Sequence, residues 1–197
     1  MRNLLVQESN VAGYNVPMRK FYLTLAIFCF LPQLAFSADL QVSTKSNPPS
    51  VYHVYFSPRG GCTKAITDAI GQAKQSIFVQ AYSFTSYPIA QALIDAEKRG
   101  LKVEAILDKG QLHEKKTKLG LLAKGGIPVR LDGVHAIAHN KVMVVDGKTV
   151  ITGSFNFTNA AEERNAENLL IVDDAVLAAQ YTSNWQIHQK HSEPYKL

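Results

Sequence analysis

The feature that most constrains the fold of this 197-residue chain is a short apolar run, Val142 to Val145, with polar residues on both sides. His139 and Lys141 precede the run, and Asp146-Gly147 follows it. Because Asp-Gly between apolar segments is a strong signal for a tight turn, the run predicts one arm of a β-hairpin. Side chains alternate along a strand, so His139 and Lys141 should point to the same face.

The turn also predicts the register of the hairpin. A two-residue loop pairs Val145 with Lys148, which makes paired residue numbers sum to 293 and places His139 opposite Ser154. A loop longer by two residues makes the sum 295 and places His139 opposite Asn156. Both registers gather the same polar side chains, whereas a one-residue slip would break the arrangement because register fixes the face.

The full pattern is H-x-K-x4-D-x6-G-S-x-N, and it resembles the HKD motif of the phospholipase D superfamily. Asn165-Ala166-Glu167-Asn168 adds the acidic residue that this family places after G-S-x-N. The similarity extends to residues 80–86, 99–100 and 105–108, so it covers roughly residues 50–190. The branch it resembles most is that of the small bacterial Nuc-type endonucleases, which carry one HKD motif in each chain. The matching motif positions are His139, Lys141, Asp146, Gly153, Ser154, Asn156, Glu167 and Asn168.

Alternating strand and helix patterns predict an α/β fold. We expect strands at residues 51–56, 76–84, 102–107, 127–131 and 168–172, and helices at 61–75, 89–99, 116–124 and 174–188. With the hairpin between them, this order predicts a phospholipase D-like α/β sandwich, with a mixed central sheet flanked by helices and one HKD motif per chain.

The N-terminal segment predicts export. Met18-Arg19-Lys20 is basic, Phe21 to Leu31 is apolar, and Ala35-Phe36-Ser37 has the small-x-small pattern of a signal-peptide cleavage site. The apolar run is too short to span a membrane, although an uncleaved anchor is the alternative. We therefore expect an over-extended start at 1–17, a signal peptide at 18–37, a flexible leader at 38–50, and a phospholipase D-like nuclease domain at 51–197. The processed chain is expected in the periplasm or outside the cell, without stable membrane insertion.

Charge, cysteine content and histidine spacing add weaker constraints. Removal of residues 1–37 would lower the net charge from +5 to about +3, which suits an anionic substrate without requiring one. Cys62 would then be the only cysteine, which excludes an intrachain disulfide and indicates a partly buried thiol. His135 and His139 form an H-x3-H pair, but they would lie far apart on an extended segment. Because no Cys or carboxylate completes a set in the sequence pattern, we expect neither a metal site nor a cofactor.

The resemblance implies metal-independent hydrolysis of a phosphodiester in two steps. One His139 would attack phosphorus to give a phosphohistidine. Because the chain carries one motif, the His139 of a second copy would protonate the leaving group and then activate water. The resemblance therefore implies a homodimer whose two-fold axis passes through a shared site.

The resemblance and side-chain chemistry also suggest roles for the other motif residues. Lys141 and Asn156 are expected to be catalytic and, with Ser154, to bind phosphate oxygens. Glu167 is expected to be catalytic by accepting the second ring N–H of His139.

Two motif positions are expected to be structural. Asp146 lies in the turn and should point away from the site. Gly153 should let the backbone pass close to the site or form a bulge.

The substrate predicted first is DNA, with RNA as a further possibility, bound through phosphate contacts that are tolerant of sequence. Residues 115–124 carry lysines that suit contact with a nucleic-acid phosphate backbone. One alternative is a phospholipase D that acts on membrane phospholipids, for which Phe155 and Phe157 are the only apolar hints near the motif. The other is a non-catalytic nucleic-acid-binding module, against which the intact motif argues.

Overall fold

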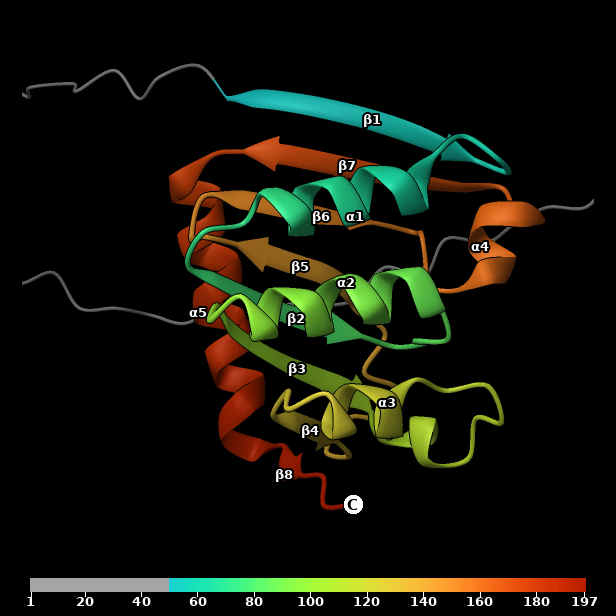
Figure 1. The fold of residues 1–197 in the computed structure, drawn as a ribbon, viewed down its shortest axis with the longest axis vertical. Helices are drawn as coiled ribbons and strands as arrows, with labels where there is room; N and C mark the ends of the chain where they lie inside the picture. Colours follow the sequence, from blue (N-terminus) through green and yellow to red (C-terminus); the bar gives the residue numbers. More distant parts are fainter. Residues whose placement is uncertain (1–49) are drawn as a thin grey trace, which may run out of the picture. The chain divides into compact units, whose positions relative to one another are not determined.

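The computed structural model describes residues 50–197, in which a single mixed sheet has the strand order β1-β7-β6-β5-β2-β3-β4-β8 (Figure 1). The strands are β1 Val51–Ser57, β2 Ser76–Ala81, β3 Lys102–Asp108, β4 Val129–Asp132, β5 Lys141–Val145, β6 Thr149–Gly153, β7 Glu167–Asp173 and β8 Glu193–Pro194. The helices are α1 Cys62–Gln72, α2 Tyr87–Lys98, η1 Lys109–Leu112, α3 Leu119–Lys124, α4 Asn159–Glu163 and α5 Ala175–His191. The predicted α/β fold with a mixed sheet flanked by helices is confirmed.

The strand directions define one functional edge of the sheet. Strands β2, β3 and β4 are parallel, and β5, β6, β7 and β1 follow in antiparallel pairs. The ends of β2 and β6 therefore lie at the same edge as the starts of β5 and β7. We call this edge, where Ala81 pairs with Lys141 and Ser57 pairs with Glu167, the motif edge.

Helices pack on both faces of the sheet. Helices α1, α2 and α3 cover one face and bury the main hydrophobic core, whereas α5 crosses the other face (Figure 1). The indole N–H of Trp185 on α5 donates to the carbonyl oxygen of Val79 at 2.9 Å, and its ring stacks on Phe78 at 4.7 Å. A smaller apolar cluster under α5 comprises Val142, Val144, Val150 and Ala178.

The expected elements are present, with ends that differ from the expected bounds by a few residues in either direction. Helix α1 ends at Gln72. The N–H of Ala73 donates to the carbonyl oxygen of Ile70, and those of Lys74 and Gln75 turn to the Asp146 carboxylate. Helix α3 begins at Leu119, so most of the predicted basic stretch lies in the loop before it. The short elements η1, α4 and β8 were not predicted.

The predicted register of the β5–β6 hairpin is wrong. Val145 pairs with Thr149, so paired residue numbers sum to 294. Residues 146–148 form a three-residue loop, in which Asp146 and Gly147 have φ angles of 53° and 60°. Pairing between β5 and β6 stops before it reaches His139, and the motif residues meet because their strands end at one edge.

None of the helices among residues 50–197 is long and apolar enough to cross a membrane. The predicted start, signal peptide and leader fall almost entirely on residues 1–49, outside the described part of the chain.

Candidate active site at the motif edge

Lys141 begins β5 and is the buried cation of the motif edge. Its side chain is directed along the face that α1 and α2 cover, and the residue is only 7% exposed. Its Nζ donates to the carbonyl oxygen of His139 at 2.6 Å and lies 5.2 Å from the centre of the Tyr82 ring. Burial lowers the pKa of Lys141, and the negative charge of Glu167 opposes that shift. An ammonium has three N–H donors, and this one has a single hydrogen-bond acceptor within residues 50–197.

His139, two residues before Lys141, is exposed to solvent. Its ring tilts against Tyr82, with the ring centres 4.6 Å apart. The loop before it is held by the N–H of Ala138, which donates to the Asp108 carboxylate at 2.7 Å. Within residues 50–197 the imidazole itself forms no hydrogen bond, so both ring nitrogens are free to meet a substrate or a second chain.

Tyr82 was not singled out as a site residue by sequence reasoning. It follows β2 directly, and its backbone N–H donates to the carbonyl oxygen of Asn140 at 2.8 Å. The signal that identifies it is positional, because a polar aromatic residue at the end of a buried strand faces the same edge as the motif. Beside it lies a cavity of about 220 Å³, which is also lined by Ser83, Asp108, Gly110, Gln111, His113 and Glu114.

Gly153 and Ser154 join the end of β6 to the start of β7. Gly153 has φ 145°, and a Cβ at this position would lie 2.3 Å from the carbonyl oxygen of Asn168. The hydroxyl oxygen of Ser154 accepts hydrogen bonds from the backbone N–H and the side-chain amide of Asn168, at 3.0 and 3.3 Å. Close backbone approach thus accounts for glycine at 153, and Ser154 is engaged with β7.

Asn156 and Glu167 have different surroundings. The Oδ1 atom of Asn156 is buried and has no hydrogen-bond partner in the part of the chain that the structure describes. Such an atom carries a desolvation cost unless a ligand or another chain satisfies it. The carboxylate of Glu167 accepts from the side-chain amide of Asn165 at 3.0 Å. No hydrogen bond joins Glu167 to His139 among the described residues, so that role stays a prediction.

Asp146 lies at the opposite end of β5 from Lys141. Its carboxylate accepts the backbone N–H groups of Lys74, Gln75 and Ser76, at 2.9, 2.7 and 3.0 Å. Burial raises the pKa of Asp146, but these three hydrogen bonds and the charge of Lys74 outweigh burial and hold the pKa below its usual range. The geometry supports a structural role and places the side chain away from the motif edge.

Cys62, at the start of α1, is fully buried. Burial raises the pKa of its thiol to about 11, and the nearby carboxylates of Glu162 and Glu167 add to that effect. The thiol is therefore protonated at neutral pH and is a poor nucleophile.

The sequence pattern pairs His135 with His139 and offers no carboxylate to complete a set, and it thereby overlooks Asp132. In the structure His135 lies beside Asp132, His188 and His191, with one ligand atom of each residue within 4.8 Å of the others. The carboxylate is Asp132, three residues before His135 at the end of β4. The two further histidines come from α5, more than fifty residues later in the chain, and residue spacing alone does not show that they meet His135.

Comparison with known proteins identifies the family of this fold and site. Residues 66–187 match the family described as "Cardiolipin synthase, PLD-like domain". The chain belongs to this family and to the phospholipase D superfamily, on the single-domain Nuc-type branch. A "Phospholipase D" from Rickettsia bellii is 50% identical over 130 residues, which cover 66% of this chain and 65% of that protein. The match therefore spans just under two thirds of the relative's length.

Two solved structures share the fold over their full length. The phospholipase D family member Nuc from Salmonella typhimurium superposes with a TM-score of 0.72 and 37% identity, covering 76% of this chain and 100% of that one. NucT from Helicobacter pylori has a TM-score of 0.69 and 26% identity, covering 75% of this chain and 100% of the other.

Proposed function

We propose that this chain is a metal-independent phosphodiesterase that cuts DNA, with RNA as a further substrate, after export from the cytoplasm. The observation that carries the proposal is the pairing of an exposed, unbonded imidazole at His139 with a buried ammonium at Lys141 on one sheet edge. Membership of a family of phospholipase D-like hydrolases and the similarity to Nuc support phosphodiester chemistry.

The proposed reaction has two displacements. A ring nitrogen of His139 attacks phosphorus and forms a P–N bond, while the P–O bond to the leaving group breaks. The His139 of a second copy gives its proton to the leaving oxygen. The same imidazole then takes a proton from water, whose oxygen attacks phosphorus as the P–N bond breaks.

The other groups stabilise charge. Two N–H donors of Lys141 have no acceptor among residues 50–197 and can bind phosphate oxygens, and the buried position strengthens that attraction because little water screens it. The side-chain amide N–H of Asn156, in the same motif, donates to a phosphoryl oxygen, whereas its buried Oδ1 is an acceptor and needs a donor from a ligand or another chain. Ser154 already accepts two hydrogen bonds, so its hydroxyl hydrogen remains available for a phosphate oxygen.

Nucleic acid is the proposed substrate for two reasons. His113 and Glu114 line the cavity next to Tyr82, and the exposed Lys115 and Lys116 follow them directly, where they suit a phosphate backbone. Phe155 and Phe157, the apolar hints of a lipid site, are 0% and 1% exposed and belong to the core. Neither ring is available to contact an acyl chain.

A membrane phospholipid is the second candidate substrate. The relatives from Rickettsia are named phospholipase D. In addition, the loop that leads to His139 exposes Val134 and Ile137, which are 67% and 56% accessible. Exposed apolar side chains beside a reactive site suit insertion into a lipid surface.

The test is cleavage of plasmid DNA by the purified chain in excess EDTA, with His139→Ala as the inactive variant. His53→Ala is the matched control, because His53 is an exposed histidine on β1, far along the sheet from β5. We expect cleavage by wild type and His53→Ala and a loss of at least about 10³-fold in His139→Ala. A folded wild-type protein that leaves DNA intact but releases headgroup from phosphatidylcholine vesicles would replace the nuclease proposal with the lipid one.

A further inference from the structure

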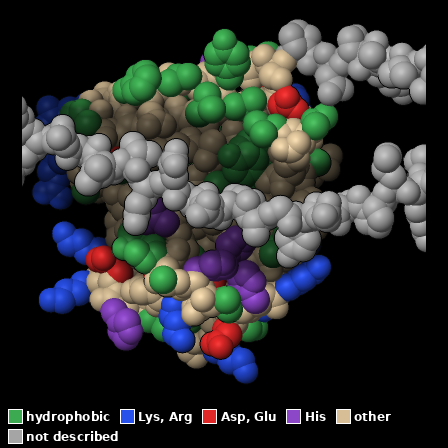
Figure 2. All heavy atoms as spheres, turned by 180° about the vertical axis from the view of Figure 1, so that it is seen from behind, with side chains coloured by type: hydrophobic (Ala, Val, Ile, Leu, Met, Phe, Trp, Pro, Cys, Tyr) green, Lys and Arg blue, Asp and Glu red, His purple; other side chains and the backbone are tan. Residues whose placement is uncertain are grey.

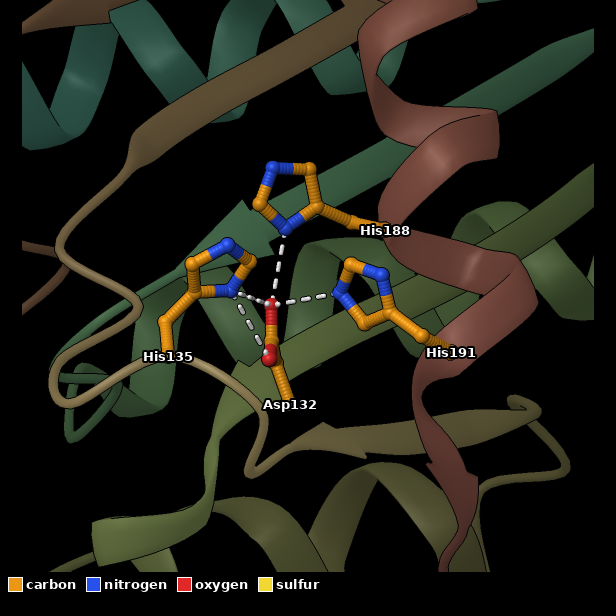
Figure 3. Close-up of side chains that lie close together, drawn as sticks. All are labelled: Asp132, His135, His188 and His191. Atoms are coloured by element: carbon orange, nitrogen blue, oxygen red, sulfur yellow. Dashed lines mark hydrogen bonds and ion pairs between the residues drawn. The ribbon is translucent and has the colours of Figure 1, made fainter.

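A cluster of three histidines and one aspartate lies outside the motif and takes no part in the proposed reaction. Asp132 ends β4, His135 lies in the loop that follows, and His188 and His191 lie one turn apart near the end of α5 (Figure 3). Figure 2 shows histidine side chains gathered in the lower part of the face that α5 covers. The two segments are brought together only by the fold.

The side chains converge on one point. The Oδ2 atom of Asp132 lies 2.7 Å from Nδ1 of His188, 3.1 Å from Nδ1 of His135 and 3.3 Å from Nε2 of His191. In a tetrahedral zinc site with bonds of 2.0–2.1 Å, neighbouring ligand atoms are about 3.3 Å apart. The three separations from Oδ2 are close to the edges of such a tetrahedron, and all four ligand atoms lie within 4.8 Å of one another.

Hydrogen bonding to the carboxylate of Asp132 places a condition on all three imidazoles. His188 and His191 face Oδ2, and Nδ1 of His135 lies 3.1 Å from Oδ2 and 3.2 Å from Oδ1 (Figure 3). All three rings would have to carry a proton on the nitrogen that faces the carboxylate. A metal ion would instead accept the nitrogen lone pairs and bind the carboxylate, so each group would have its preferred partner.

The carboxylate of Asp132 is shielded from water. Its side chain is 0% exposed, so only neighbouring protein groups or a bound ion can satisfy its oxygens.

We propose that Asp132, His135, His188 and His191 bind one divalent transition-metal ion, with Zn²⁺ as the best match to three imidazoles and one carboxylate. The ion is structural: it joins the end of β4 and the following loop to the last turns of α5. It also fixes residues 133–138, which lead to His139. Its ligands come from β4, the following loop and α5, and β4 lies three strand positions, about 14 Å, from β5.

The test is zinc binding by the full chain, purified without a histidine tag and stripped with a chelator. Competition with a chromophoric chelator gives the stoichiometry and the affinity, and Co²⁺ in place of Zn²⁺ reports four-coordinate geometry by its visible spectrum. We expect one ion per chain. Zinc at about 100 times its Kd should raise the Tm by roughly 5–10 °C.

Substitutions of single histidines test whether these residues bind the ion. His135→Ala removes a ligand from an exposed loop and leaves the core unchanged, and His191→Ala removes one from α5; each should weaken zinc binding by at least about 100-fold. His53→Ala, a histidine on the distant β1 edge, should bind zinc as wild type does. A wild-type chain that binds no zinc would overturn the proposal and leave a hydrogen-bonded cluster. Equal zinc affinity in wild type, His135→Ala and His191→Ala would overturn it too, because the ion would then be held elsewhere. Neither readout depends on nuclease activity.

Discussion

At the scale of single residues, the burial of Lys141 makes its charge sensitive to pH. Because burial lowers the pKa of this amine below its ordinary value of 10.5, the ammonium is lost at a lower pH than that of an exposed lysine. If the ammonium holds the phosphate, kcat/KM falls as pH rises through that lowered pKa. We expect the alkaline limb of the pH–rate profile to lie below 10.5.

Arginine at this position separates charge from other causes of the alkaline limb. A guanidinium stays protonated above pH 12, so Lys141→Arg should keep residual activity and move the limb upward. Lys141→Met should lose about 10²–10³-fold in kcat at all pH values. The control is Lys148→Arg, in the exposed hairpin loop. An alkaline limb at the same pH in Lys141→Arg and wild type would show that another group titrates.

Asp146 offers a prediction about stability rather than activity. Asp146→Ala removes the acceptor of three backbone N–H groups and should lower the free energy of unfolding by about 2–3 kcal/mol at pH 7. Asp146→Asn should cost less, since asparagine keeps one acceptor and tolerates a positive φ. Urea denaturation measures both values.

The stability that the Asp146 carboxylate contributes depends on pH, and the sign of its pKa shift gives the direction. The folded-state pKa of Asp146 is lower than its unfolded-state value, so its contribution is fully present above about pH 5. The contribution decreases as pH falls through the ordinary range of an aspartate toward the folded-state pKa. The difference in the free energy of unfolding between wild type and Asp146→Asn should therefore become smaller below about pH 4. Asp68→Asn, which breaks an exposed ion pair with Lys64, should change stability by less than about 0.5 kcal/mol.

At the scale of elements, Gly153 ends β6 at a position where the neighbouring backbone of β7 leaves no room for a side chain. Alanine there would combine a φ of 145° with a Cβ 2.3 Å from the carbonyl oxygen of Asn168. We expect Gly153→Ala to lower the free energy of unfolding by about 2–4 kcal/mol and to disturb the contact between Ser154 and β7. Gly120→Ala, within α3 and with open space around its Cβ, should be neutral or stabilise by up to about 1 kcal/mol. Similar unfolding midpoints for the two variants would contradict this account.

The hairpin shows where sequence reasoning about elements succeeds and where it stops. The apolar run of residues 142–145 and the Asp-Gly turn predicted both arms correctly, because local chemistry determines them. The register differs from the predicted one because Lys148 belongs to the loop and Val145 pairs with Thr149. The backbone carbonyl oxygen of Lys148 accepts a hydrogen bond from the N–H of Asp174. That tertiary contact involves a residue twenty-six positions away, which no local pattern contains.

At the scale of the whole molecule, topology explains which parts of the site were predictable. His139 and Lys141 are neighbours in sequence, and the resemblance supplied Asn156 and Glu167. The convergence of Asp132 and His135 on His188 and His191 depends on α5 returning across the sheet to β4. Tyr82 similarly meets His139 because β2 pairs with β5. Long-range pairings of this kind carry no signature in residue spacing.

The last prediction concerns the second chain that the proposed reaction requires. If each active site uses His139 from two subunits, a dimer with one His139→Ala subunit is inactive. In the test, equal amounts of wild type and His139→Ala are unfolded together and refolded. Random association then gives about one quarter of dimers with two wild-type subunits. The activity should then be about one quarter of that of the same total amount of wild type, whereas independent sites would retain about one half. Wild type mixed with His53→Ala is the control and should keep full activity. Sedimentation as a fully active monomer, or a retained half of the activity in the mixture, would exclude a shared site.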